Sequence, residues 1–204
     1  VKAVAPKDVI NLRWTGGVQP GSLPTNFRIV RPIRRKEVFP GLTRVTLAGI
    51  DVEAFSVDGI HVKLIMPLGK DLAPVWPSMS LNGGFVWPDG EDTLHARYVT
   101  VRAIRAPERE IDIDVATHAG GLISAWAQMQ DDAQEVGLMG PGGDEALPRN
   151  DGVVLAADLT GLPALARLIE STGGDVTGHV FAAAPSQATL DAYLPKSRLA
   201  VEAI

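Results

Sequence analysis

The stretch that decides the fold is residues 95–127, HARYVTVRAIRAPEREIDIDVATHAGGLISAWA. Its order of residue types predicts a strand, a turn, a second strand, a glycine-rich turn and the start of a helix. The second strand, residues 110–115, alternates between acidic and apolar residues, which predicts one buried face and one solvated face. Asp112 and Asp114 are therefore expected on a solvated edge rather than in acid–base catalysis.

The turn at Gly120 and Gly121 has the features of an anion site. Glycines let backbone N–H groups approach a ligand closely, and a helix that begins near Leu122 would direct its free amides at that ligand. Arg97, on the neighbouring strand, can place a guanidinium on the same anion. Together these groups suit a diphosphate, although on spacing alone an ordinary hairpin with a helix cap at Ser124 is favoured.

Composition narrows the class of protein. The 204-residue chain has a formal charge of −5 and is 46% hydrophobic, which predicts a globular protein with a sizeable core and argues against nucleic-acid partners. The chain has no cysteine, which excludes disulfides, thiolate metal sites and iron–sulfur clusters. No apolar run approaches the roughly 20 residues of a membrane span. The four histidines are isolated in the sequence, so no metal site is expected. The protein is expected to be a monomer in the cytoplasm.

Strand patterns come first along the chain, and a helix–strand alternation follows. Strands that precede any convincing helix predict an antiparallel β-barrel or sandwich. Residues 67–94 are expected to be a long loop that borders it, with disorder as the alternative. The last part reads β-α-β-α-β, half of a doubly wound parallel sheet, and it stops in an apolar strand, so the native protein is expected to continue beyond Ile204. The expected layout is an irregular lead-in (1–25), a barrel (26–143), a linker (144–151) and a partial α/β domain (152–204).

The opening stretch resembles the flavin-binding core of the siderophore-interacting proteins, which are ferric-siderophore reductases related to the ferredoxin-NADP reductases. One residue departs from the pattern of that family: Val99 stands where the family has a tyrosine, and Tyr98 of this chain comes one position earlier. Adjacent strand residues face opposite ways, so Tyr98 can replace that tyrosine only if the strand shifts or bulges. Residues 156–164, AADLTGLPA, also resemble a turn of this family. The matching residues of the opening pattern are Arg97, Thr100, Arg102, His118, Gly121, Ser124, Trp126-Ala127 and Gly140-Pro141-Gly142-Gly143.

The resemblance implies a barrel that binds FAD and a following NAD(P)H-binding-like α/β domain. Electrons would come from NAD(P)H or from a reduced ferredoxin-like carrier, and no residue needs to act as a catalytic acid or base. The Thr100 hydroxyl can form a hydrogen bond with a flavin ring nitrogen, and Trp126 is expected in the core beneath the turn. The implied cofactor-binding residues are Arg97, Tyr98, Val99, Thr100, Val101, Arg102, His118, Gly121, Leu122, Ile123, Ser124, Asp158 and Thr160.

The implied substrate is a ferric siderophore, which is bulky and commonly anionic, so a reductase needs a locally basic cleft. Alternation in residues 60–66 places His61 and Lys63 on one strand face, and with Arg102 they are the expected substrate-binding residues. The basic cluster at residues 31–36 is expected to be a solvated loop. The predicted function is FAD-dependent reduction of ferric siderophores to release Fe(II). The alternatives are another ferredoxin-reductase-like flavin oxidoreductase and a non-enzymatic binding module that has lost flavin.

Overall fold

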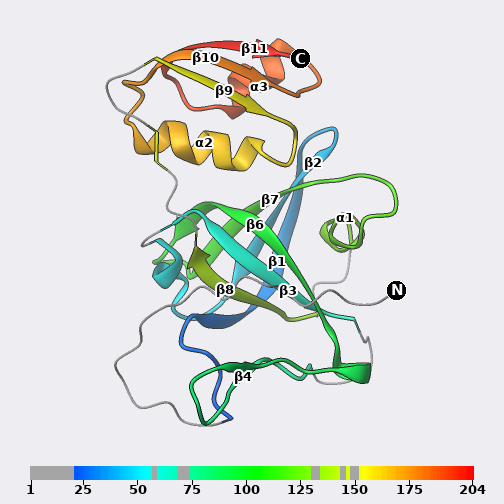
Figure 1. Cartoon of the computed structure of the whole chain (residues 1–204). Coiled ribbons are helices and arrows are strands. Elements are labelled where there is room, and N and C mark those ends of the chain that lie inside the picture. Colours follow the sequence, from blue (N-terminus) through cyan, green and yellow to red (C-terminus); the bar gives the residue numbers. More distant parts are fainter. Residues whose placement is uncertain (1–20, 57–58, 69–73, 130–133, 143–145, 148–151) are drawn as a thin grey trace.

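A computed structural model describes residues 21–56, 59–68, 74–129, 134–142, 146–147 and 152–204. Six strands of this described part close into an antiparallel barrel in the order β1-β2-β7-β6-β3-β8 (Figure 1). This confirms the predicted barrel, whereas most of the predicted lead-in lies outside the described residues. The barrel strands are β1 (Phe27–Phe39), β2 (Leu42–Ala48), β3 (His61–Pro67), β6 (Leu94–Arg105), β7 (Glu110–Ala116) and β8 (Val136–Gly142).

The sequence of β3 shows why this part of the chain forms a barrel. Alternate side chains of a strand point to opposite faces. Val62, Leu64 and Met66 point into the barrel core and are 5% exposed or less. On the outer face, Ile65 is also buried, because it packs with a second apolar cluster that includes Trp76. The predicted alternation in this strand is therefore confirmed.

The second part of the chain is a three-stranded parallel sheet with two helices, and Figure 1 shows the first of them, α2 (Leu162–Ser171), between this sheet and the barrel. The order β-α-β-α-β confirms the predicted α/β fold class. Ser186 caps the second helix as predicted, since its Oγ accepts from the Thr189 N–H at 3.2 Å. No helix in the described residues is long and apolar enough to cross a membrane. The elements are β9 (Val153–Ala157), α2 (Leu162–Ser171), β10 (Thr177–Ala182), α3 (Gln187–Tyr193) and β11 (Arg198–Ala203).

One buried apolar cluster joins the barrel to the α/β part, and it is separate from the core inside the barrel. Phe39 and Leu42, at the β1–β2 hairpin, belong to the same buried cluster as Leu165 of α2 and Tyr193 of α3. The rings of Phe39 and Tyr193 meet edge to face with centroids 5.9 Å apart. The two parts are therefore packed directly on each other.

The expectation of one long loop over residues 67–94 is wrong in part. Met79 lies in the short strand β4 (Ser78–Met79), which pairs with β5 (Phe85–Val86). Its backbone also forms hydrogen bonds with Gly21 and Ser22, at 2.9 and 2.8 Å. These hydrogen bonds give the segment regular structure that hydrophobic periodicity does not reveal. The smaller elements are the 3₁₀ helices η1 (Val52–Ser56) and η2 (Gly90–Asp92), the strands β4 (Ser78–Met79) and β5 (Phe85–Val86), and the helix α1 (Leu122–Ala127).

The basic cluster at residues 31–36 is not a loop, as the sequence had suggested, but the middle of β1. Pro32 pairs with Leu47, and the register then shifts before Arg34 pairs with Thr46. A proline has no N–H to donate to a strand partner, and a bulge is a place where a strand tolerates one. The prediction failed because cross-strand pairing with β2, rather than local composition, decides this segment.

The expectation of a solvated face on β7 is also wrong. Asp112 and Asp114 are only 3% and 5% exposed. Arg105 binds both oxygens of Asp112 at 2.7 Å, and Arg44 binds both oxygens of Asp114 at 2.7 and 2.8 Å. Thr46 also donates to Asp112 at 2.8 Å. Buried carboxylates need such partners, and here the partners come from other parts of the sequence.

Candidate functional site

The outer face of β3 and β6 carries a group of polar and aromatic side chains. The two strands pair without a register shift along the whole of β3. His61 and Thr100 lie opposite each other, with Nδ1 3.3 Å from Oγ1. Lys63 and Tyr98 are also opposite, and the Lys63 ammonium lies 5.2 Å from the centroid of the Tyr98 ring, whose residue is 61% exposed. The structure therefore gathers four of the predicted site residues on one face.

Val99 and Val101 face the other way. Val101 is fully buried in the barrel core, and Val99 packs against that core. Because β3 and β6 pair in register through Tyr98, no bulge brings Tyr98 to the place of Val99. Arg97 shares the strand face of Val99, but its side chain is exposed and its Nη1 donates to the carbonyl of Ala96 at 2.8 Å. The place of the expected tyrosine thus holds an aliphatic side chain.

The turn before α1 is closed by hydrogen bonds. The backbone N–H of His118 donates to Ser124 Oγ at 3.1 Å, and that hydroxyl donates to the carbonyl of Ala116 at 3.3 Å. A Cβ built on Gly121 would lie 2.8 Å from both the His118 ring and Ser124 Oγ, which is closer than real Cβ atoms come to a neighbour. A side chain at Gly121 would have to displace the His118 ring and the Ser124 hydroxyl. The turn brings together His118, Gly121 and Ser124 as predicted site residues.

Helix α1 presents its first turn beside Gly121. Gly121 is the N-cap and supplies no side-chain acceptor to the amides of this turn, which also lack intrahelical acceptors. Leu122 is 53% exposed, while Ile123 packs against the barrel core. Trp126 is 3% exposed within the same core, which confirms its predicted place. The helix is thus fixed to the barrel through one side, and its first amides stay available.

These residues fit the diphosphate of the predicted cofactor, FAD. The amides that begin α1 are the donors that anions bind at such turns. His118 adds an imidazole at the same turn. Within the described residues, no hydrogen bond joins Arg97 to this turn, so its part in the same anion site stays a prediction.

Arg102 lies at the other end of the strand, against α2. It occupies a register shift of β6 against β7, between Val101 and Ala103. Its guanidinium binds both carboxylate oxygens of Glu170 at 2.9 and 3.2 Å and lies 5.7 Å from the centroid of the Tyr193 ring. Arg102 thus contacts Glu170 and Tyr193, whereas His61 and Lys63 contact Thr100 and Tyr98. Its predicted roles toward cofactor and substrate remain predictions.

Comparison with known proteins decides the family. The model of a family described as the siderophore-interacting FAD-binding domain matches residues 32–145, which is more than half of the 204-residue chain. The chain belongs to this family. The resemblance predicted from the residues around Arg97 and Gly121 is thereby confirmed, and the match supports FAD as the cofactor of the barrel.

Three relatives illustrate the likeness. Ferric vibriobactin reductase ViuB of Vibrio cholerae is 32% identical over 160 residues, which are 76% of this chain and 57% of that protein. NADPH-dependent ferric-chelate reductase of Escherichia coli is 28% identical over 148 residues, which are 71% of this chain and 57% of that protein. The structure of the siderophore-interacting protein SipS from Aeromonas hydrophila matches with a TM-score of 0.70 and 24% identity, over 88% of this chain and 67% of that one. This chain therefore spans little more than half the length of the two reductases.

In this member of the siderophore-interacting family, Asp158 and Thr160 form the turn after β9. Asp158 Oδ1 accepts hydrogen bonds from the Thr160 hydroxyl at 2.6 Å and from the amides of Thr160 and Gly161 at 2.9 Å. The hydrogen bond from the Thr160 hydroxyl, followed by that from the Gly161 amide, lowers the pKa of the Asp158 carboxyl. Their hydrogen bonds are therefore local ones that shape the start of α2, and their predicted contact with a cofactor stays a prediction.

Sequence reasoning missed the α2 residues that hold β6. Arg167 Nη1 donates to the carbonyl of Val101 at 2.6 Å, and Glu170 binds Arg102 as described. The one available signal was their spacing of three residues in the predicted helix, which puts both on one helix face. Nothing local in the sequence shows that this face meets a strand more than 60 residues earlier.

Proposed function

We propose that this chain is the flavin-binding part, with adjoining α/β part, of a reductase that converts Fe(III) in a ferric siderophore to Fe(II). The observation that carries the proposal is the turn at residues 118–124, in which the His118 ring and the Ser124 hydroxyl lie against Gly121, in a chain of the siderophore-interacting FAD-binding domain family. The names of the two related reductases support the same activity. The NADPH-dependent relative supports NAD(P)H as the electron donor, and a reduced ferredoxin-like carrier is the other candidate donor.

When bound, FAD would supply the step between a two-electron donor and two one-electron ferric acceptors. The residues of this chain bind and orient it. The amides around Gly121, together with Arg97 and His118, would hold the diphosphate. The Thr100 hydroxyl, beside His61, would offer a hydrogen bond at the edge of the ring system. Reduction lowers the charge on the iron and weakens its binding by hard oxygen ligands, so Fe(II) can leave the siderophore.

We assign capture of the substrate first to Lys63 and His61. They share the outer face of β3, and the exposed ring of Tyr98 lies next to the Lys63 ammonium. A local positive charge raises the concentration of an anionic complex at such a face. Arg102 would contribute from the α2 interface, where Glu170 already offsets its charge.

Charge reversal at Lys63 tests this assignment. The probe is a ferric tris-catecholate complex, with NADPH as donor and FAD in excess. Lys63→Glu should raise the KM for the probe by about tenfold, with a smaller change in kcat, because opposed charges weaken encounter and binding. Lys36→Glu, on the exposed side of β1, is the matched control and should leave KM unchanged. Equal KM values for the two variants would remove Lys63 from substrate capture, and wild-type chain that reduces no ferric complex would end the proposed function.

We further propose that residues 26–143 act as the FAD-binding unit and residues 152–204 as an NAD(P)H-binding-like unit, with residues 144–151 as the linker. The change from antiparallel barrel strands to the parallel β9–β11 sheet supports this division. The proposal includes a monomer in the cytoplasm. The absence of cysteine and the need for NAD(P)H support that compartment. Sedimentation of the FAD-loaded protein would test the monomer.

A further inference from the structure

The backbone of β6 changes its pairing beside Thr100. Up to Thr100, β6 pairs in register with β3, and the Val101 N–H donates to the carbonyl of Ile60 at 2.8 Å. Against β7, the register shifts between Val101 and Ala103. A bulge leaves a residue out of the ladder and bends the strand. The carbonyl of Val101 is therefore next to a local departure from regular pairing.

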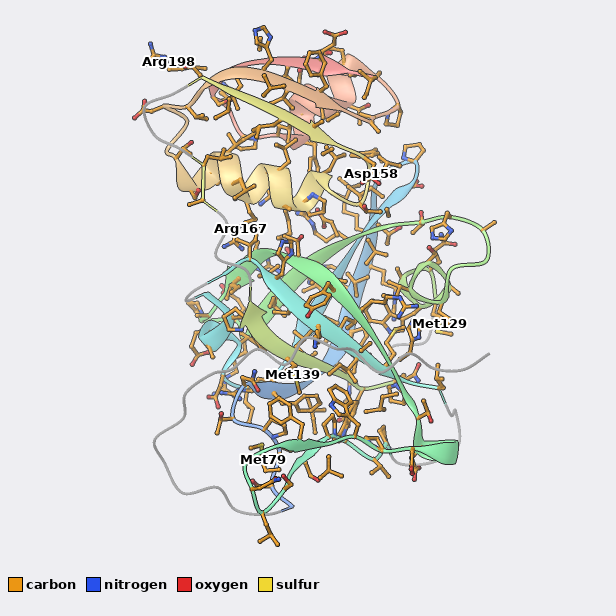
Figure 2. All side chains as sticks on the ribbon, viewed as in Figure 1. Met79, Met129, Met139, Asp158, Arg167 and Arg198 are labelled. Carbon is orange, nitrogen blue, oxygen red and sulfur yellow. The ribbon has the colours of Figure 1, made fainter. Side chains whose placement is uncertain are left out.

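A side chain of α2 reaches this point. Arg167 Nη1 donates to the carbonyl of Val101 at 2.6 Å, and Figure 2 shows the Arg167 side chain where α2 meets the barrel. Burial lowers the pKa of Arg167, an effect that Glu170 opposes and Arg102 reinforces. A guanidinium nevertheless stays charged in proteins, so this is a charge-assisted hydrogen bond to a backbone carbonyl.

The residue after Val101 is held by the same helix. Glu170, one turn beyond Arg167, binds the Arg102 guanidinium through both of its oxygens. Two consecutive residues of β6 are thus fixed by two side chains of α2, one through the backbone and one through the side chain. The residue that precedes Val101 in β6 is Thr100. Its side chain is 5% exposed, and its Oγ1 lies 3.3 Å from His61 Nδ1.

We propose that Arg167 is a positioning residue for the flavin site. By holding the Val101 carbonyl at the bulge, Arg167 fixes the backbone that carries Thr100 and so the direction of the Thr100 hydroxyl. This inference rests on the proposed function, because it assigns Arg167 an effect on bound FAD that no direct contact provides. It also means that the packing of α2 on the barrel influences the conformation of β6, the strand proposed to bind the cofactor.

Three variants of the 204-residue chain test the role of Arg167. Arg167→Met keeps the length of the side chain and removes the hydrogen bond. Arg167→Lys keeps a cationic donor for the single bond that Arg167 makes to Val101. Arg198→Met, on the exposed side of β11 and far from the barrel in Figure 2, is the matched control.

Two readouts are compared across these variants. The first is amide hydrogen exchange of residues 99–105, for which Arg167→Met should lose protection by about tenfold, as expected for loss of one charged hydrogen bond. The second is the position of the FAD absorption band and the FAD dissociation constant, which should shift for Arg167→Met and return toward wild type for Arg167→Lys. Arg198→Met should change neither.

The outcomes separate the two claims. If wild type binds FAD and Arg167→Met gives the same exchange, band position and affinity, the positioning role is overturned. Altered exchange with an unchanged band and affinity would also overturn it, since Arg167 would then hold the strand without affecting the cofactor. If wild type binds no FAD, the proposed function fails and this role falls with it.

Discussion

The two ends of β6 are held in different ways. From Val101 to Arg105 the strand is tied by charges: Arg167 holds the Val101 carbonyl, Glu170 binds Arg102, and Arg105 binds Asp112. From Arg97 to Thr100 the side chains make few such contacts, and Tyr98 lies exposed beside Lys63. Charged contacts thus hold this strand where it meets the α/β part, while the exposed side chains of Arg97 and Tyr98 lie at the candidate flavin site.

The largest loss of stability is expected from a change at Asp114 of β7, which lies where the barrel meets the α/β part. Its side chain is fully buried and binds Arg44 through both oxygens, and the Tyr193 hydroxyl donates to it at 2.7 Å. The hydrogen bond to Asp114 raises the pKa of Arg44 despite the opposing effect of burial, and burial, followed by the charge of Asp114, raises the pKa of Tyr193. Asp114 therefore links β2, β7 and the helix α3.

Asp114→Asn should lower the free energy of unfolding by about 3 kcal/mol, because it leaves the Arg44 charge without its counter-ion in a partly buried place. Urea unfolding followed by tryptophan fluorescence measures the loss. Asp175→Asn, an exposed carboxylate between α2 and β10, is the control and should change the value little. A similar small loss for both variants would show that the Arg44–Asp114–Tyr193 contacts do not stabilise the junction.

Arg105 gives an intermediate effect that depends on pH. Burial raises the pKa of Asp112, but hydrogen bonds from Arg105 and Thr46 and the charges of Arg105 and Arg44 outweigh it, so the pKa lies below its ordinary value of 3.8. A carboxyl whose pKa is lower in the folded state stabilises the fold above its unfolded pKa, and this contribution is lost as the pH falls through the folded pKa.

Arg105→Met should therefore cost about 2 kcal/mol of unfolding free energy at pH 7, after allowance for the part of the Arg105 side chain that solvent reaches. The difference from wild type should shrink as the pH falls below 3.8, since Asp112 then becomes protonated in both proteins. Urea unfolding at a series of pH values measures it, with Arg198→Met as the control. A difference that stays constant into acid would mean that the Arg105–Asp112 pair is not its source.

The smallest loss of stability is expected from a change at Tyr98, in the part of β6 from Arg97 to Thr100. Tyr98→Ala removes an exposed ring and its contact with the Lys63 ammonium, so the unfolding free energy should fall by less than about 1 kcal/mol. The same urea experiment measures it. A loss as large as that of Asp114→Asn would mean that the ring of Tyr98 is part of the stabilising framework, and the contrast between the two ends of β6 would disappear.

The sequence predicted what depends on local pattern. Alternation located β3, β6 and β7, the Gly-rich turn located α1, and the helical spacing after Gly161 located α2. It failed where distant partners decide the outcome. Asp112 and Asp114 looked solvated because Arg44 and Tyr193 are 70 and 79 residues from Asp114 in the chain. The bulge at Arg102 has no signature of its own, since it depends on register against β7.

In the candidate site, too, the sequence predicted the local contacts and missed those that depend on distant segments. His118, Gly121 and Ser124 come together as expected, because their contacts lie within one turn. The positions of Tyr98 and Val99 required the register of β6 against β3, which no single strand contains. The partners of Arg102 required the docking of α2 on the barrel.

The central claim is that the turn at residues 118–124 holds the diphosphate of FAD, and an equilibrium titration of the flavin-free chain with FAD tests it most directly. Wild type should bind one FAD per chain. Gly121→Val should weaken binding by at least about tenfold, because the added side chain would enter the space of the His118 ring and the Ser124 hydroxyl. Gly152→Val, where a Cβ would meet no atom within 4 Å, should bind like wild type. Equal FAD affinity for Gly121→Val and wild type would contradict the account.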